Sequence, residues 1–121
     1  MKYIIEKRLI DLAIAVNNLC QKLSNSYMSQ HLKTQLIRSS TSAALNYAEA
    51  QVAESRKDFI HKLNLVLKEL KESKVCMKLL YGSFKDSYMP EFEKQIIECD
   101  ELIAIIFKTL QTARKNMLSN K

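Results

Sequence analysis

Hydrophobic residues recur along this chain at the three-and-four spacing of amphipathic helices. In the first segment, from about residue 3 to 24, the apolar positions are Ile5, Leu9, Leu12, Val16, Leu19 and Leu23. This spacing places them on one side of a helix, whereas a half-buried strand would show strict alternation. The run "SNSYMS" that follows supplies serines of the kind that cap helix starts. A second helix is therefore expected from about 29 to 53.

Capping signals and apolar stripes predict two further helices. Ser55-Arg-Lys-Asp58 has the form of a capping box, which places a third helix at about 55–81, just before the only glycine, Gly82. The only proline, Pro90, precedes two glutamates in the pattern of a first helical turn, so a fourth helix is expected at about 90–117. The core stripe expected for the third helix is Phe59, Leu63, Val66, Leu70, Met77 and Leu80. The stripe expected for the fourth is Phe92, Ile96, Cys99, Ile103, Ile106, Leu110, Ala113 and Met117.

Composition supports an all-α fold. One glycine and one proline among 121 residues leave little material for the turns that connect strands. A chain of this length forms one hydrophobic core, and short connections make sequential helices antiparallel. The expected architecture is a single domain over residues 1–121, an up-down-up-down four-helix bundle.

The second helix carries unusually little side-chain bulk on its inner face. The residues expected on that face are Leu32, Leu36, Ser39, Ala43, Asn46, Tyr47 and Ala50. Small side chains let a neighbouring helix approach closely, and large residues such as Phe59, Phe92 and Phe107 are expected to fill the remaining space.

Further apolar residues lie away from these predicted core faces. They include Ile37 and Ala44 beside Ser40 in the second helix, and Cys76 and Ile97 farther along the chain. So much apolar surface is more than a soluble monomer usually exposes, so self-association is expected. The candidate interface residues are Ile37, Ala44, Leu65, Val75, Leu79, Leu102 and Ile105. Single hydrophobic residues scattered over an ordinary surface are the alternative interpretation.

Three stretches of sequence, "QLIRSSTSAALNYAEA", "SRKDFIHKL" and "LKELKESKVCMKLLY", cover the middle of the chain. They resemble the 23S rRNA intervening-sequence protein family, a family of four-helix bundle proteins. The motif positions that carry the resemblance most directly are Gln35, Arg38, Ser39, Ser42, Asn46, Glu49 and Asp58. The resemblance implies a ring-shaped homopentamer of bundles. Its relatives include the accessory protein of diversity-generating retroelements, so the implied partners are a reverse transcriptase and structured RNA or DNA.

Basic residues form a stripe on the third helix. The chain holds 19 Lys and Arg against 13 Asp and Glu, a formal net charge of +6. On a helical wheel one sector contains Lys57, Lys68, Lys71, Lys74 and Lys78, and Lys85 would extend it if the helix reached so far. Such a stripe neutralises phosphates with little sequence preference. A charged face that only keeps the helix soluble is the alternative.

Residues with possible chemistry give weaker signals. Arg38, Ser42 and Glu49 lie close in angle on the second helix, where a structural role is favoured, and Asn46 is expected to be a satisfied polar group near the core. Asp58-x-x-His61 resembles half of a di-iron site but lacks the second pair that this chemistry requires. Arg56-x4-His61 fits the loose pattern of a class of helical ribonucleases. No metal and no cofactor are expected.

The cysteines and the longest apolar runs indicate the cellular compartment in which the protein is expected. Cys20, Cys76 and Cys99 are odd in number, far apart and without a secretory segment, so reduced, buried thiols in the cytoplasm are expected. No apolar run approaches the length of about 20 residues that spans a bilayer. The resulting hypothesis is a non-enzymatic helical oligomer that binds nucleic acid or acts as an adaptor. A purely structural oligomer and a ribonuclease are the alternatives.

Overall fold

The computed structural model describes residues 1–84 and 89–119, and these contain four α-helices and no strand. In chain order the helices are α1 (Lys2–Lys22), α2 (Tyr27–Gln51), α3 (Arg56–Ser83) and α4 (Pro90–Ser119). Each begins and ends within about one turn of its predicted position, and the all-α fold is confirmed. Lys85 falls in the segment 85–88, outside the described residues.

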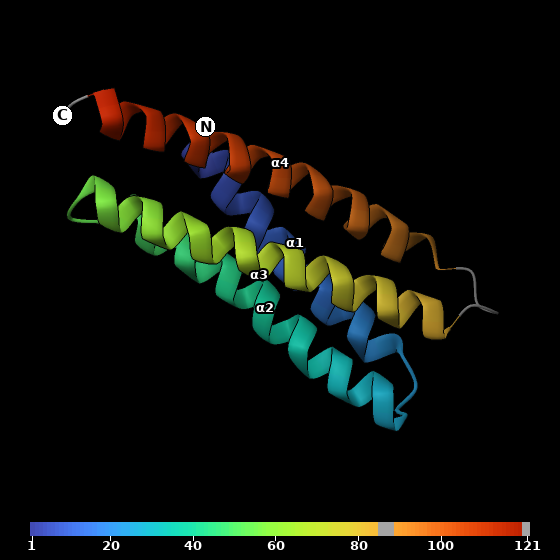
Figure 1. Ribbon diagram of the computed structural model, residues 1–121. Helices are drawn as coiled ribbons and strands as arrows, with labels where there is room; N and C mark the ends of the chain where they lie inside the picture. Colours follow the sequence, from blue (N-terminus) through green and yellow to red (C-terminus); the bar gives the residue numbers. More distant parts are fainter. Residues whose placement is uncertain (85–88, 120–121) are drawn as a thin grey trace.

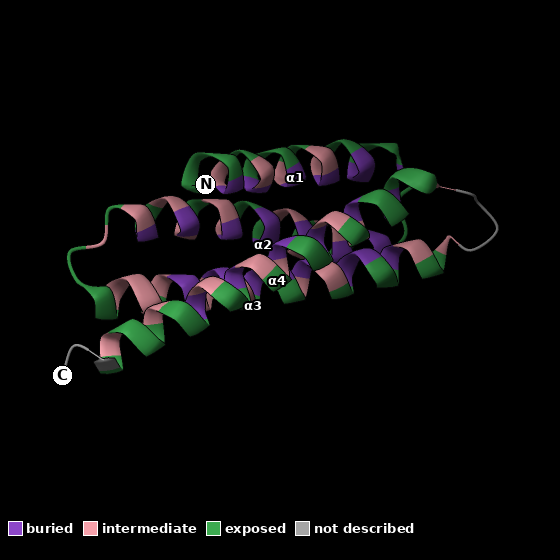
Figure 2. Cartoon of the chain, turned by 90° about the horizontal axis from the view of Figure 1, so that it is seen from above, coloured by how far each residue is buried: buried purple, intermediate pink, exposed green. Residues whose placement is uncertain are grey.

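The helices lie side by side in a bundle (Figure 1). Each contacts the next in sequence, and α1 also contacts α4, which closes the circuit around one core. Buried residues follow the inner sides of the helices and exposed residues the outer sides (Figure 2). The stripe predicted for α1 is buried in full, as are the aliphatic and methionine positions predicted for α3 between Leu63 and Leu80. No helix in the described part combines the length and hydropathy needed to cross a bilayer.

The helix starts follow the serine signals in the sequence. Ser26 caps α2: its hydroxyl accepts a hydrogen bond from the Ser29 amide, and the Ser29 hydroxyl in turn accepts one from the Ser26 amide. Ser55 caps α3 by accepting a hydrogen bond from the Asp58 amide at 3.0 Å. Both caps satisfy amides that have no partner within the helix.

Small residues on α2 allow its close packing against α3, and these two helices share the most extensive contact in the bundle. Ser39 and Ala43 are fully buried there. Because α2 also contacts α1, it buries more than one side: Ser40 is buried, and Ile37 and Ala44 are half-buried against the core. The second apolar surface of α2 is therefore largely covered inside the same chain.

Three predicted positions are wrong. Leu102, expected at an interface between copies, is 0% exposed and belongs to the core, whereas Phe107, expected inside, is 48% exposed. Relative to the predicted stripe, the inward face of α4 is therefore rotated about the helix axis, so that it includes Leu102 and excludes Phe107. Cys76 is buried within the chain, which confirms the buried thiol but not its expected position away from the core face. It lies three residues after the buried Ser73, on a helix whose largest contact is with α2, so α3 buries a broader face than its main stripe predicts.

Candidate functional site

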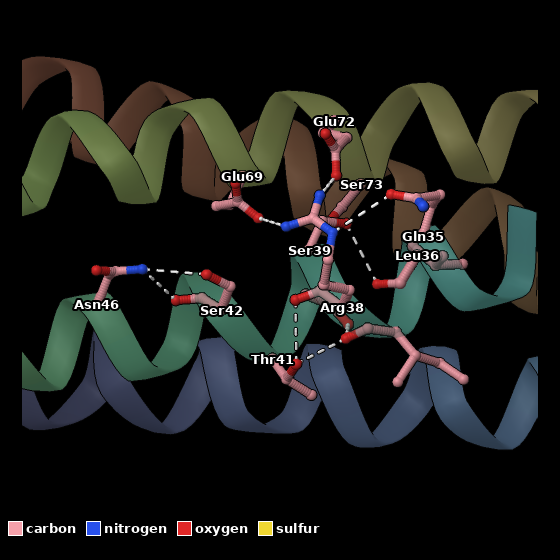
Figure 3. Close-up of polar contacts among 12 residues, drawn as sticks. Gln35, Leu36, Arg38, Ser39, Thr41, Ser42, Asn46, Glu69, Glu72 and Ser73 are labelled. Atoms are coloured by element: carbon pink, nitrogen blue, oxygen red, sulfur yellow. Dashed lines mark hydrogen bonds and ion pairs between the residues drawn. The ribbon is translucent and has the colours of Figure 1, made fainter.

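Helix α3 separates its acidic residues from most of its lysines. Glu69 and Glu72 lie on the side that faces α2, where both carboxylates form ion pairs with Arg38 (Figure 3). Lys68 and Lys71 precede these glutamates by one residue each, so they are turned by about 100° around the helix axis and are exposed. The exposed side of α3 is consequently mainly positive, because Glu69 and Glu72 are paired with Arg38 and Asp58 is the only other acid of the helix.

Arg38 is the centre of the acidic cluster. Its Nη1 lies 2.9 Å from Oε2 of Glu69, its Nη2 contacts Glu72, and its Nε donates to Gln35 Oε1 at 3.3 Å. Glu69 is only 5% exposed, so its charge is largely removed from water. A buried carboxylate needs such a partner, and the guanidinium fork serves two carboxylates at once. The structure thus brings together the family-motif residues Gln35 and Arg38 with Glu69.

Ser39, Ser42, Asn46 and Glu49 also make contacts within α2 or between α2 and α3, whereas the motif residue Asp58 donates its amide to the Ser55 cap. Ser39 Oγ lies 2.7 Å from Ser73 Oγ, and the Asn46 amide donates to the Ser42 carbonyl and hydroxyl oxygens (Figure 3). Glu49 Oε1 lies 3.6 Å from Lys62 Nζ. Asn46 is half-buried, and both of these hydrogen bonds stay within α2. None of these four side chains lines a pocket described for residues 1–84 and 89–119.

The five lysines of the predicted stripe are not equivalent. Lys74 is half-buried and its Nζ lies 2.5 Å from Asp100 Oδ1 on α4, so much of its charge is offset within the chain. Lys57, Lys68, Lys71 and Lys78 are exposed and form no ion pair with any residue in 1–84 or 89–119. We call these four residues the lysine face of α3.

Exposed hydrophobic residues adjoin the lysine face. Val75 and Leu79 are exposed on the same side of α3. The other interface candidates are partly covered within the chain; they are Ile37, Ala44, Leu65 and Ile105. A further exposed pair, Ile10 and Ile14, stands on the outer side of α1 and was missed. Their spacing of four residues, opposite the core stripe, is the signal that identifies them.

The residues of the ribonuclease and metal motifs do not form a site within one chain. Arg56 and His61 are both exposed, but five residues on a helix turn the chain by about 140°, so their side chains point to different sides. The metal motif at His61 is not completed either, because no group of three or more metal-ligating side chains occurs among the described residues.

The cysteines are free and buried. Burial raises the pKa of the Cys20 thiol to about 11 and that of Cys99 to about 12, and it also raises the pKa of Cys76. The Cys99 thiol donates a hydrogen bond to the Leu70 carbonyl oxygen at 3.2 Å. Thiols of this kind remain protonated near neutral pH and are poor nucleophiles.

Comparison with known proteins identifies the family. The family model described as 23S rRNA-intervening sequence protein matches residues 1–108. A crystal structure of a protein with unknown function from the S23 ribosomal protein family of Bacteroides thetaiotaomicron has 29% sequence identity and a TM-score of 0.78. The match covers 92% of this chain and 99% of that one. No curated protein matches. With nearly its whole length matched by the family model and the same bundle in a solved relative, the chain belongs to the 23S rRNA intervening-sequence protein family.

Proposed function

We propose that this protein is a non-enzymatic nucleic-acid-binding or adaptor protein whose contact surface is the lysine face of α3. The observation that carries the proposal is the division of charge on this helix. Lys57, Lys68, Lys71 and Lys78 are exposed and unpaired within the described residues, while Glu69 and Glu72 are engaged by Arg38 on another side. Phosphate groups that approach these lysines therefore meet Glu69 and Glu72 already paired with Arg38, and Asp58, beside Lys57, is the remaining acid of the helix.

The chemistry of the lysine face favours backbone contact over base recognition. An ammonium group on a flexible stem acts as a point charge, and the bidentate guanidinium contacts that recognise guanine are missing from these four positions. Lys68, Lys71 and Lys78 rise along the helix by about 15 Å in total. We expect affinity that depends steeply on salt and little on sequence.

A triple variant tests this proposal against a matched control. Lys68, Lys71 and Lys78 are replaced by Gln, which lowers the formal net charge from +6 to +3. The control replaces the exposed Lys2, Lys22 and Lys94 by Gln, which gives the same net charge but removes it from α1 and α4. Fluorescence anisotropy with labelled RNA and DNA of mixed sequence measures affinity over a range of salt concentrations.

We expect the lysine-face variant to bind at least tenfold more weakly than the control, with a salt slope reduced by about 0.7–0.9 for each phosphate that the variant no longer neutralises. Equal weakening in both variants would show that net charge alone matters. Unchanged binding in the lysine-face variant would remove the proposal and leave the purely structural oligomer.

Self-association belongs to the same proposal and is supported by exposed apolar side chains. Ile10 and Ile14 on α1, with Val75 and Leu79 on α3, present aliphatic surface that a second copy can cover. The family resemblance implies five copies in a ring. Repeating the lysine face around such a ring multiplies weak phosphate contacts without a large charge on each chain.

The three cysteines support a cytoplasmic location for the protein. All three are free, buried thiols, as expected in a reducing compartment.

A further inference from the structure

A pocket of about 880 Å³ lies at one end of the bundle. Its walls come from the end of α2, the α2–α3 connection, the first turn of α3 and the C-terminal half of α4, and Met1 at the start of α1 completes the lining. The residues used below are Glu54, Arg56, Phe59, Ile105, Lys108 and Ala113, all of which line it. Pockets of roughly 300–1,000 Å³ hold small organic ligands in proteins.

The unequal lengths of the helices explain the pocket. With 21 residues against 30, α1 is about 32 Å long and α4 about 45 Å. In both views α1 begins well short of the end formed by the α2–α3 connection and the C-terminal end of α4 (Figures 1 and 2). The last turns of α4 therefore have no α1 beside them. Phe59 and Ile105 pack against the core from this position but stay half-buried.

The pocket has an apolar wall and a positive rim. Phe59, Ile105 and Ala113 are half-buried and supply the apolar contacts. Arg56 and Lys108 are exposed, and neither forms an ion pair with a residue of the described segments. The lining holds these two side-chain cations against one carboxylate, that of Glu54. An occupant that matches this lining is apolar along its length and negative at one end.

We propose that the pocket binds a fatty carboxylate, with the acyl chain against Phe59, Ile105 and Ala113 and the carboxylate between Arg56 and Lys108. This site is separate from the lysine face and does not depend on nucleic-acid binding. Burial of methylene groups supplies most of the affinity, and charge-assisted hydrogen bonds select an anionic head group.

Dodecanoate at concentrations below micelle formation is the probe. Calorimetry measures its affinity for the full chain, and amide chemical shifts in a ¹⁵N-labelled sample locate it. Ala113→Leu narrows the pocket from a half-buried helix position, and Arg56→Gln with Lys108→Gln removes the two cations. The matched control, Lys68→Gln with Lys71→Gln, removes two cations on the lysine face. Circular dichroism checks that each variant is folded.

We expect saturable binding with shifts concentrated at residues 105–116 and 50–59, at least tenfold weaker binding in the variant lacking Arg56 and Lys108, and unchanged binding in the control. Ala113→Leu should weaken binding at least tenfold, because the larger side chain occupies part of the apolar wall. Dodecyltrimethylammonium, with the opposite head-group charge, should bind at least tenfold more weakly than dodecanoate. Equal affinity for the two probes, shifts located elsewhere, or full binding by a folded Ala113→Leu variant would overturn the proposal.

Discussion

The hydroxyl oxygens of Ser39 on α2 and Ser73 on α3 lie 2.7 Å apart, and both side chains are fully buried. Ser39 Oγ is also 3.2 Å from the Leu36 carbonyl oxygen. Both hydroxyls are satisfied when Ser73 donates to Ser39 and Ser39 donates to Leu36. A leucine at either position would not fit between helices that approach so closely. Close packing against α3 therefore explains why α2 carries small residues on this face.

Removal of both partners of this pair should cost less than the two single removals added together. Ser39→Ala leaves the buried Ser73 hydroxyl without its partner, so we expect a loss of about 1–2 kcal/mol in the free energy of unfolding. The Ser39→Ala, Ser73→Ala double variant should lose less than the sum of the two single variants. Urea unfolding measures all three. Strict additivity would show that the two hydroxyls do not interact.

Arg38 should be important for stability because it neutralises a buried acid. Arg38→Met keeps much of the aliphatic stem but leaves Glu69 unpaired at 5% exposure, and we expect a loss of about 1–3 kcal/mol. Lys7→Met is the control, since it breaks the exposed Lys7–Asp11 pair on α1 and should cost under about 1 kcal/mol. Urea unfolding compares the two variants, and equal losses would contradict a special role for Arg38.

Alkaline pH should destabilise the protein partly through Cys99. Burial raises the pKa of this thiol from its ordinary value of 9.0 to about 12 in the folded protein. Between these values the unfolded chain binds fewer protons than the folded chain, so the free energy of unfolding falls as the pH rises. Urea midpoints from about pH 8 to about pH 11 should fall more steeply for the parent than for Cys99→Ala. Parallel curves would contradict this assignment.

The outer side of α1 should contribute to self-association. Ile10→Gln with Ile14→Gln removes the exposed aliphatic pair while leaving the core stripe intact. We expect sedimentation to show a shift toward the single-chain mass of 14.0 kDa, with helical content unchanged. Val75→Gln with Leu79→Gln tests the aliphatic residues beside the lysine face in the same way. If neither variant changes the sedimenting mass, these residues do not hold copies together.

The four helices could be predicted from sequence because their stripes and caps are local signals. Ile5 to Leu19 in α1 and Leu63 to Leu80 in α3 keep the helical period, and the capping serines mark where α2 and α3 begin. Periodicity identifies a helix reliably when its apolar positions form one narrow face.

The rotation of α4 was not predictable in the same way. Its apolar residues surround more than half of the helix, and they include the exposed Ile97 and Phe107 as well as the buried Leu102. Only packing against α3 and α1 selects the inward side. The pairing of Arg38 with Glu69 and Glu72 also escaped prediction, because it joins two helices whose relative rotation the sequence pattern leaves open.

The close contact between α2 and α3 also bears on how the chain folds. These helices are joined by the short segment 52–55, so the most extensive contact in the bundle forms between neighbours in sequence and closes only a small loop. Topologies dominated by such local contacts fold quickly. We therefore expect the α2–α3 hairpin to form before α1 and α4 dock onto it, so that in stopped-flow measurements conservative changes at Ser39 or Ala43 slow refolding more than they speed unfolding.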